Sequence, residues 1–418
     1  MHVQAVSREA AGPVRESASL ESTPEIRVAR SLAEVEALRE AWTAWGGHRD
    51  SDIDFYLMIL ASYTQVIRPH VIGIFQDGKP EAILIGRLEW KSVGFRVGYF
   101  SAGSLTVRCL TFVYGAMRGN GSAENARTLV GELLDCLKRK EADIAQFEWA
   151  PVESPLYPAA MELPGRLGRD LAPAKQAHHR LVLPETFESV FARLSGNRKK
   201  EIRRNVKRLH AHPAGEFKIV CYRDPADMDR FFQDTEEIAK KTYQRGLGAT
   251  IADTPQMRMR IGLAAKKGWL RGYVLYLGER PCAFWIGMLY GKTFVSEFMG
   301  FDPEFRQFSP GTVLLTQVLE KLCERAHGDV VEDLDFGWGT AEYKELFCSE
   351  TWQEACVFVF GPTLKGMAAK SLRTGAVVVD GTARKILGSA LPRVKRMWRD
   401  RLARRNRPAE SGHHGGNE

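Results

Sequence analysis

The 418-residue chain is 44% apolar and 26% charged, a composition typical of a globular protein with two to three domains. No run approaches the roughly 18 consecutive apolar residues of a membrane-spanning helix. Residues 1–24 lack the apolar core of a secretory signal, so we expect a disordered lead-in. The seven cysteines are scattered, which favours buried free thiols in a reducing cytoplasm and predicts neither a metal site nor a permanently bound cofactor.

The net charge of +8 is concentrated in two segments. Residues 384–407 contain ten basic residues and one acidic residue, and residues 193–208 contain eight and one. The rest of the chain is therefore net acidic, and nucleic acid is not the expected partner. Apolar residues alternate with the basic ones in 384–407, which favours peripheral contact with the anionic inner membrane, although a solvated tail would have the same pattern.

The first half predicts a strand leading into a helix over residues 27–45, with Ser31 as N-cap and Glu34 as its capping-box partner. Turn residues and apolar periodicity then predict a helix over 55–66, two strands around a turn at 77–80, a strand through Val113, a helix over 123–140 and a strand over 143–149.

The second half repeats these elements in the same order. Three pairs of segments match at similar offsets: 79–86 with 280–287, 118–123 with 306–311, and 147–149 with 336–338. This ordered set indicates a tandem duplication. We expect an α+β fold in which helices cover a mostly antiparallel mixed sheet, divided into domains 25–170 and 177–360 and followed by a basic tail, 361–418.

The segment 297–344 has the layout of a group-transfer enzyme. A helix pattern begins after Pro310-Gly311, and the start of a helix offers unpaired N–H groups and a positive dipole end. With Arg306 just upstream, this loop predicts a site for a phosphorylated carrier. Asp335 then ends the next strand, and Tyr343-Lys344 follow it.

These motifs resemble the GNAT acyltransferase superfamily, in particular its tandem branch. That branch includes acetyltransferases associated with bacterial cellulose and exopolysaccharide synthesis and, more distantly, Fem-type peptidyltransferases. The resemblance covers residues 25–360 and implies acyl-CoA, most simply acetyl-CoA, as co-substrate. The acyl group would go to an amine or hydroxyl of a sugar, a polysaccharide precursor or a lipid-linked acceptor.

In GNAT enzymes a loop of pattern (Arg/Gln)-x-x-Gly-x-(Gly/Ala) holds the pyrophosphate of the carrier. The first half has this pattern from Arg118 to Ala123, whereas the second half replaces its glycine with Ser309. The first half nevertheless lacks the reactive groups, since Gln146 occupies the position of Asp335. We therefore predict a non-catalytic first half and a carrier site in the second, formed by Arg306, Ser309, Gly311 and Thr312.

Three catalytic candidates follow from the second half. Asp335 would orient or deprotonate the acceptor, or it is simply a solvated carboxylate at a strand end. By resemblance Tyr343 would protonate the leaving thiolate, although a tyrosine there would also close the core. Glu297 lies in an apolar strand and is either a base or the partner of a buried cation.

Two further residues are candidates for binding substrate. Lys344 would hold a phosphate or carboxylate, or face water. Arg198 shares the apolar face of a helix pattern and should pair with Glu297, Asp335 or the substrate, unless residues 195–197 break that helix. For the His178-His179 pair we favour a structural role.

Two other functions remain open. A Fem-like enzyme would take an aminoacyl group from charged tRNA and use residues 193–208 for phosphate contacts, although no sustained heptads for a coiled-coil insertion are present. A non-catalytic scaffold for a polysaccharide synthase is the third alternative.

Overall fold

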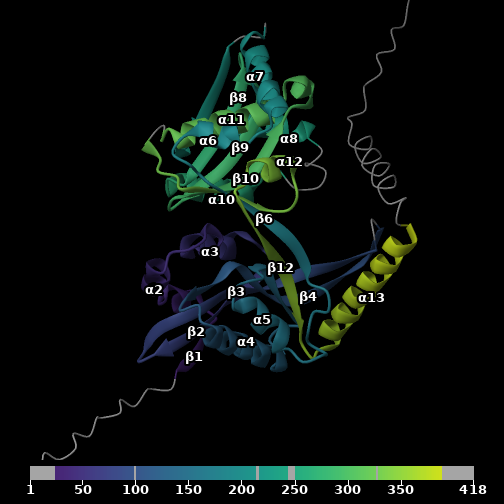
Figure 1. The fold of residues 1–418 in the computed structure, drawn as a ribbon. Helices are drawn as coiled ribbons and strands as arrows, with labels where there is room; N and C mark the ends of the chain where they lie inside the picture. Colours follow the sequence, from purple (N-terminus) through teal and green to yellow (C-terminus); the bar gives the residue numbers. More distant parts are fainter. Residues whose placement is uncertain (1–23, 98–99, 213–215, 243–249, 326–327, 388–418) are drawn as a thin grey trace, which may run out of the picture.

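The computed structural model describes residues 24–97, 100–212, 216–242, 250–325 and 328–387. Within them, twelve strands form one sheet in the order β1-β2-β3-β4-β5-β12-β6-β11-β10-β9-β8-β7. Neighbouring strands are antiparallel except in two pairs, β4 with β5 and β10 with β11. Figure 1 shows two lobes, each with helices against its own part of the sheet. The predicted α+β fold with a mostly antiparallel sheet is confirmed.

The first module is built mainly from residues 24–162. Its elements are β1 (Glu25–Ala29), α1 (Leu32–Glu36), α2 (Arg39–Ala44), η1 (Arg49–Ser51), α3 (Ile53–Ser62), β2 (Val66–Gln76), β3 (Lys79–Val97), β4 (Phe100–Gly119), α4 (Ala123–Lys138), β5 (Ile144–Pro151) and α5 (Leu156–Glu162).

The second module comprises residues 174–347. Its elements are β6 (Ala174–Val182), α6 (Phe187–Ala192), α7 (Gly196–His210), β7 (Phe217–Tyr222), η2 (Pro225–Asp227), α8 (Met228–Lys241), α10 (Pro255–Lys266), β8 (Leu270–Leu277), β9 (Arg280–Tyr290), β10 (Thr293–Phe301), η3 (Pro303–Phe308), α11 (Pro310–Cys323), β11 (Asp333–Trp338) and α12 (Glu342–Phe347).

Local sequence signals set several of these boundaries. Ser31 and Glu34 form the predicted capping box at the start of α1. The β2–β3 turn has positive φ at Asp77 and Gly78, the conformation that a two-residue hairpin requires. Ser195 caps α7 by accepting a hydrogen bond from the Arg198 amide. The helical pattern over 191–209 is therefore broken at the place where a break was anticipated.

The two modules repeat one motif. In each, a strand passes through a helix into a parallel neighbouring strand: β4, α4 and β5 in the first module, and β10, α11 and β11 in the second. Each parallel strand is preceded by an antiparallel meander. This arrangement agrees with the duplication inferred from the sequence.

The modules exchange their last strands. After α5 the chain enters β6, which pairs with β11 of the second module, and after α12 it returns as β12 (Glu350–Phe360), which pairs with β5 of the first. Ala355, Val357 and Val359 of β12 lie in the core of the first module, while Leu181 of β6 lies in that of the second. The expected domain 177–360 therefore has to be corrected, because its final strand belongs to the first module.

The parallel strands of the second module diverge at the centre of the molecule. β10 and β11 pair only from Thr293 to Val295 and from Asp333 to Asp335. Beyond this point β10 follows β9 to Phe301, and β11 follows β6 to Trp338. The divergence opens the sheet beside Asp335, on the side from which the chain enters η3 and α11.

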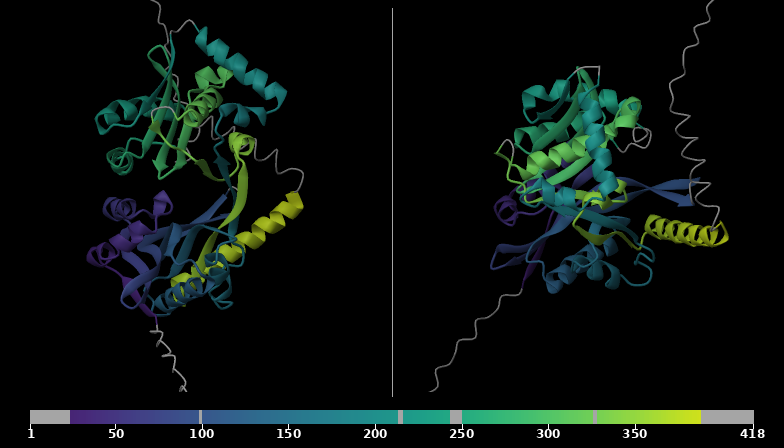
Figure 2. Two further views of the ribbon diagram at one scale, coloured as in Figure 1. Left: turned by 60° about the vertical axis from the view of Figure 1, so that its left-hand side comes forward. Right: turned by 45° about the horizontal axis from the view of Figure 1, so that its top comes forward.

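The segment after Phe360 is also more ordered than expected. Helix α13 (Leu364–Leu387) packs along β3, β4 and β12, with Ala369 buried (Figure 2). Residues 388–418 of the predicted basic tail, 361–418, and residues 1–23 of the predicted lead-in, 1–24, lie outside the described residues. None of the described helices has the length and hydropathy needed to cross a membrane.

Candidate active site

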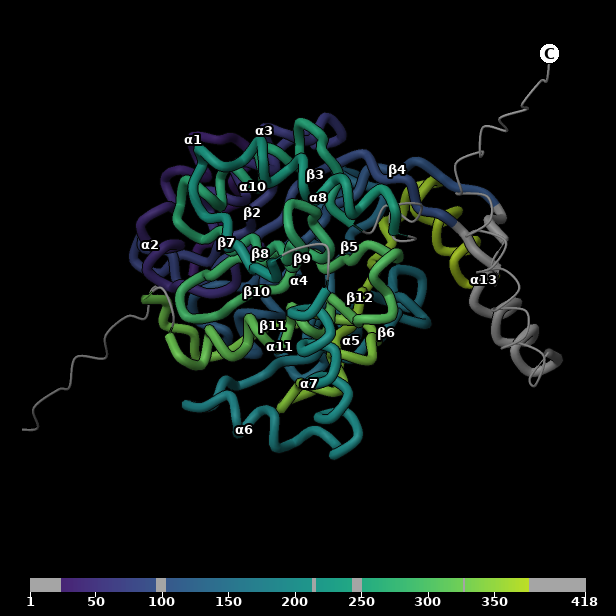
Figure 3. Tube along the Cα trace, turned by 90° about the horizontal axis from the view of Figure 1, so that it is seen from above, coloured from purple at the N-terminus to yellow at the C-terminus, as the bar shows by residue number. Residues whose placement is uncertain are grey.

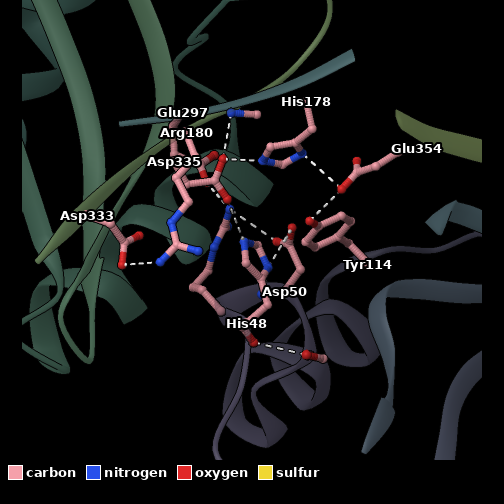
Figure 4. Close-up of polar contacts among 12 residues, drawn as sticks. His48, Asp50, Tyr114, His178, Arg180, Glu297, Asp333, Asp335 and Glu354 are labelled. Atoms are coloured by element: carbon pink, nitrogen blue, oxygen red, sulfur yellow. Dashed lines mark hydrogen bonds and ion pairs between the residues drawn. The ribbon is translucent and has the colours of Figure 1, made fainter. Parts of the chain in front are cut away.

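Polar side chains from both modules meet where β10 and β11 diverge (Figure 4). Asp335 Oδ1 lies 2.6 Å from His178 Nε2 and accepts a 2.6 Å hydrogen bond from the Gly337 amide. On the other side of the imidazole, Nδ1 lies 3.0 Å from Glu354 Oε1, off the line of a hydrogen bond. The same Glu354 oxygen accepts a 2.8 Å hydrogen bond from the Tyr114 hydroxyl. His178 thus lies between two buried carboxylates.

The strand exchange brings this cluster together. His178 comes from β6 and Glu354 from β12, and these two strands pair with each other at the centre of the sheet. The imidazole stacks on the Trp352 indole, with 4.3 Å between ring centroids. Because these strands are far apart in the sequence, the cluster forms only when both modules are folded.

The electrostatics of the cluster favour charged groups. Burial opposes the imidazolium of His178, but its contacts with Asp335 and Glu354 outweigh burial and raise its pKa to about 9. Burial likewise opposes ionisation of Asp335, yet the hydrogen bonds from His178 and His48 hold the pKa of this carboxyl well below its usual range. Asp335 is therefore a carboxylate, and His178 an imidazolium, at neutral pH.

The first module contributes His48 from the start of η1. Its Nδ1 accepts a 3.1 Å hydrogen bond from the Asp50 amide, so the neutral ring carries its proton on Nε2. Nε2 lies 3.6 Å from Asp335 Oδ2. His48 also contacts the Tyr114 ring edge-on, with 4.5 Å between centroids. Asp335 thus has a histidine from each module.

Glu297 pairs with buried cations, which is one of the two interpretations that the sequence allowed. One carboxylate oxygen contacts Arg49 of η1 and the other contacts Arg260 of α10, and the side chain is only 5% exposed. Both guanidinium groups also lie over the Phe55 ring. With both oxygens occupied, Glu297 joins the modules ionically, and its predicted catalytic role gains no contact that would support it.

The predicted carrier loop lies at the end of β10. Ser309, which replaces the expected glycine, has a φ of 50°, in the left-handed region where glycine is usual. The Thr312 amide donates to the Ser309 carbonyl at 3.0 Å, so this amide is engaged rather than free as expected. Pro310 has no N–H group. The Gly311 amide comes before the Thr312 amide, which is the first in this turn to donate a backbone hydrogen bond. Arg306 is exposed beside the loop.

The basic helix α7 lies against this loop. Arg208 donates to the Gln307 carbonyl at 3.1 Å, and its guanidinium covers the Phe308 ring. Figure 3 shows α7 and α11 side by side. Four further cations of α7 are exposed: Lys200, Arg203, Arg204 and Lys207. The segment 193–208 therefore places positive charge next to the loop from 306 to 312.

The expected partners of Arg198 were wrong. Its guanidinium contacts Glu201 at 3.0 Å and also Glu342 of α12, not Glu297 or Asp335. The reason is the break at Ser195, which puts Arg198 in the first turn of α7, while Ile202 and Leu209 further along form the buried face. A role of Arg198 in substrate binding remains a prediction.

Lys344 lies close to Asp335, whereas the ring of Tyr343 lies against Phe336. Lys344 Nζ donates to the Trp338 carbonyl at 2.7 Å, and burial lowers its pKa to about 8, although Asp335 counteracts this. Tyr343 contacts Phe336 edge-on and packs with the core of the second module. Phe336 adjoins Asp335 in β11, at a point where the register with β6 shifts. The described ring contact of Tyr343 is thus with Phe336, and its catalytic role stays a prediction.

The equivalent position in the first module holds a different pair. Asp335 is opposite Arg180 in β6, and Gln146 is opposite Phe358 in β12. His178 lies two residues before Arg180, and Cys356 lies two residues before Phe358. Gln146 Nε2 donates to Cys356 Sγ at 3.1 Å. An amide and a thiol thus replace the carboxylate and imidazolium of the second module.

A cavity of about 410 Å³ adjoins the cluster on the side of the first module. Its wall combines aromatic rings, amides and charged groups from both modules, namely Asp50, Phe55, Tyr56, Ile59, Tyr63, Gln65, Arg87, Val113, Tyr114, Gln146, Glu148, Trp149, Arg260, Trp338 and Cys356. In the part of the chain that the structure describes, no group of three or more His, Cys, Asp or Glu side chains is placed to hold a metal ion.

Sequence reasoning found Asp335 but missed most of its surroundings. It favoured a structural role for His178 and did not single out His48, Tyr114 or Glu354. The repeat contained one usable signal: β6 and β12 are equivalent strands, and aligning them places His178 over Cys356. That alignment requires knowledge of the strand exchange, which no local pattern reveals.

Comparison with known proteins agrees with this geometry. Residues 196–345 match the family described as acetyltransferase (GNAT) domain. The second module therefore contains an acetyltransferase (GNAT) domain, and the chain is an acyltransferase. The matched segment includes α7, the loop before α11, Asp335 and Lys344, all in the second module. No curated protein matches the sequence.

Solved structures share the fold at low identity. FemX matches with 11% identity and a TM-score of 0.51, over 77% of this chain and 96% of that one. The C-terminal domain of a putative lysylphosphatidylglycerol synthetase from Agrobacterium fabrum matches with 13% identity and a TM-score of 0.45, over 84% and 96%. A tandem GNAT protein from the clavulanic acid biosynthesis pathway matches with 11% identity and a TM-score of 0.45, over 82% and 100%.

Proposed function

We propose that the chain transfers an acyl group, most simply acetyl, from acyl-CoA to an amine or hydroxyl of a saccharide acceptor. The observation that carries this proposal is the opening between β10 and β11, which has Asp335 at its apex and the loop from 306 to 312 at its end. The saccharide acceptor, and a place in cell-surface polysaccharide synthesis, follow from the resemblance to the acetyltransferases of that process.

The second module has the charge needed to hold the carrier. The pyrophosphate would lie at the loop, next to the Gly311 amide and the exposed Arg306, with the cations of α7 behind it. Beyond Val295, the backbone N–H and C=O groups of β10 on the side of β11 have no strand partner among the described residues. These groups could form hydrogen bonds with the amides of the pantetheine part of acyl-CoA.

The acceptor would attack the thioester carbonyl directly. As the new C–N or C–O bond forms, the nucleophile becomes positively charged, and the Asp335 carboxylate stabilises this charge and orients the attacking group. Its lowered pKa makes it a weak base, so it positions the acceptor and passes the acceptor's proton on to solvent rather than retaining it. His178 and His48 fix the orientation of the carboxylate.

The departing thiolate also needs a proton. Lys344 lies near Asp335 and has a pKa of about 8, close to the roughly 8.5 of an ordinary thiol. Proton transfer from its ammonium group to the sulfur would therefore be nearly balanced. We assign this role to Lys344, while the role predicted for Tyr343 rests on resemblance alone.

One other function deserves a direct test. The fold shared with FemX and the exposed cations of α7 favour a Fem-like reaction that takes an aminoacyl group from charged tRNA. A non-catalytic scaffold is the less consistent alternative, because the second module matches an acetyltransferase domain.

Thermal-shift measurements distinguish the two donors. We expect acetyl-CoA to raise the melting temperature of the wild type but not that of a double variant, Arg306→Ala with Gly311→Val. Longer acyl-CoAs in the same assay define the chain length that is accepted. Stabilisation by charged tRNA alone would replace this proposal with the Fem-like one.

A further inference from the structure

We propose that the cavity beside the cluster is a binding site for an uncharged saccharide of one or two rings, held chiefly by the first module. The inference deepens the proposed function and rests on it only in making this saccharide the acceptor. It changes the predicted role of the first module from scaffold to acceptor-binding module. Three features of the cavity support it: an aromatic wall, an unpaired buried amide and a balanced charge.

The aromatic wall is formed by equivalent residues of the two modules. The indoles of Trp149 and Trp338 stack with 5.3 Å between centroids at an angle of 23°. Both line the cavity, and Trp338 is 40% exposed. The C–H faces of a sugar ring are apolar and pack on such surfaces. The phenol oxygen of Tyr114, whose proton is donated to Glu354, can still accept a hydrogen bond from a sugar hydroxyl.

The backbone of Trp149 is held in an unusual conformation. Its φ is 52°, a left-handed value that is rare for a bulky side chain. Such a residue costs stability and persists where the surroundings fix it, most often at binding or active sites. The conformation directs this indole onto Trp338 at the mouth of the cavity.

One polar group in the wall has no hydrogen-bond partner among the residues that the structure describes. Gln146 is only 8% exposed, and its Oε1 is buried without a hydrogen-bond partner, although its Nε2 is occupied by Cys356. An unpaired buried carbonyl is costly. A ligand hydroxyl in the cavity would donate to it, and hydroxyl donors are what a saccharide offers.

The charges of the wall argue against a phosphorylated ligand. Arg87 bonds Glu89 at 2.7 Å, and Arg260 is paired with Glu297. The two lining carboxylates are also paired: Glu148 lies 3.4 Å from Lys91, and Asp50 lies 3.1 Å from Arg49. With every lining charge neutralised by a neighbour, the cavity suits an uncharged ligand. Its volume lies near the lower end of the range for ligand pockets, about 300–1000 Å³.

The cavity leads to the reaction centre. Tyr114 lines it and bonds Glu354, which in turn contacts His178 beside Asp335. The Tyr114 ring also lies 6.3 Å from Trp338. A sugar stacked on the indoles would therefore have its far edge next to the cluster.

Binding of neutral and charged sugars to the full chain tests the inference. The probes are cellobiose, maltose and chitobiose, with glucose 6-phosphate and UDP-glucose as charged counterparts, titrated by calorimetry. We expect at least one neutral probe to bind, and Trp149→Ala or Gln146→Leu to weaken that binding about tenfold. Trp90→Ala is the matched control, because this tryptophan is exposed on β3 outside the cavity, and it should bind like the wild type.

Other outcomes would overturn the inference. It fails if no neutral probe binds, if the charged probes bind more tightly, or if both cavity variants bind like the wild type. The melting temperature of each ligand-free variant identifies any that does not fold, and Trp149→Phe then replaces Trp149→Ala. Acetyl-CoA stabilisation is measured in parallel, so that saccharide binding without any response to acetyl-CoA would reject the proposed function and leave the saccharide site standing.

Discussion

The two modules have the same fold but differ in the pair at the apex of their parallel strands. The second has Asp335 with His178, and the first has Gln146 with Cys356 at the equivalent positions. Both modules retain the pair of parallel strands and the helix that connects them. Two modules of one fold can therefore differ in their ionic site at two positions while the sheet around these positions stays the same.

In the loops before α4 and α11, the module that keeps the glycine pattern is not the one whose arginine is exposed. The first module has the expected glycine pattern, yet Arg118 turns inward and contacts the His48 carbonyl and the Ser51 hydroxyl. The second module lacks the glycine, yet Arg306 stays exposed beside α7. A motif match is therefore a weaker guide to the donor site than the charge and exposure around it.

Replacing His178 should have the largest effect on stability. His178→Gln leaves Asp335 and Glu354 buried without the cation between them, and breaking a buried pair in this way costs about 3–5 kcal/mol. The equivalent change in the first module, Cys356→Ala, should cost only about 1 kcal/mol. Urea unfolding of both variants measures the difference. Equal losses would remove the distinction between the two pairs.

The effect of Asp335 on turnover should be next in size. Asp335→Asn keeps the shape of the side chain but removes its charge, and we expect kcat to fall about 100-fold. Release of free CoA thiol in the presence of acceptor measures this rate. Asp333→Asn, two residues earlier in β11, breaks only the 2.8 Å contact with Arg180 and should stay within about threefold of the wild type. Similar losses in both would indicate a general disturbance of the strand.

Substitutions in the cavity of the first module should change acceptor binding rather than turnover. Gln146→Leu, at the position equivalent to Asp335, should raise KM for the acceptor about tenfold and leave kcat nearly unchanged, because the residue lines the proposed saccharide site and lies away from the reacting atoms. Steady-state kinetics at saturating acetyl-CoA separates the two constants. A fall in kcat with constant KM would place chemistry in the first module.

Raising the pH should weaken the junction between the modules. The pKa of His178 is raised from its ordinary 6.5 to about 9. The contribution of the imidazolium to the free energy of unfolding is therefore complete below pH 6.5 and is lost as the pH rises to 9. The free energy of unfolding should fall by about 2 kcal/mol between pH 7 and 9.5 from this residue alone. Denaturant titrations at a series of pH values measure the fall. His178→Gln should lack this component, and an identical pH profile would contradict the assignment.

Tyr114 provides the smallest expected effect. Tyr114→Phe removes one hydrogen bond to the Glu354 carboxylate and should cost about 1–2 kcal/mol of stability. Chemical denaturation measures the loss, and a double variant with Glu354→Gln shows whether it arises from this contact. An additive double variant would mean that Tyr114 acts elsewhere.

Much of the fold followed from local patterns. The Ser31–Glu34 capping box, the turn at Asp77-Gly78 and the two repeated hairpins were each predicted from neighbouring residues. Periodicity also located the helix that begins at Pro310, within two residues. Such signals depend on contacts close in sequence, and they are the ones a single chain displays.

The exchange of β6 and β12 could not be predicted in this way. β6 is largely polar, and neither strand carries a local signal for one module, so only the pairing with β11 and β5 decides their places. The position of His178 between Asp335 and Glu354 depends on this long-range pairing. Tyr343 follows β11 closely in the sequence, and its ring contacts Phe336, the neighbour of Asp335 in that strand.

We propose that only the second module holds the acyl donor. A crystal structure with bound acetyl-CoA would locate the donor. We predict that the carrier lies between β10 and β11, with its pyrophosphate at residues 309–312 and its thioester near Asp335. Acetyl-CoA between β4 and β5, with its pyrophosphate at residues 120–123, would contradict the account.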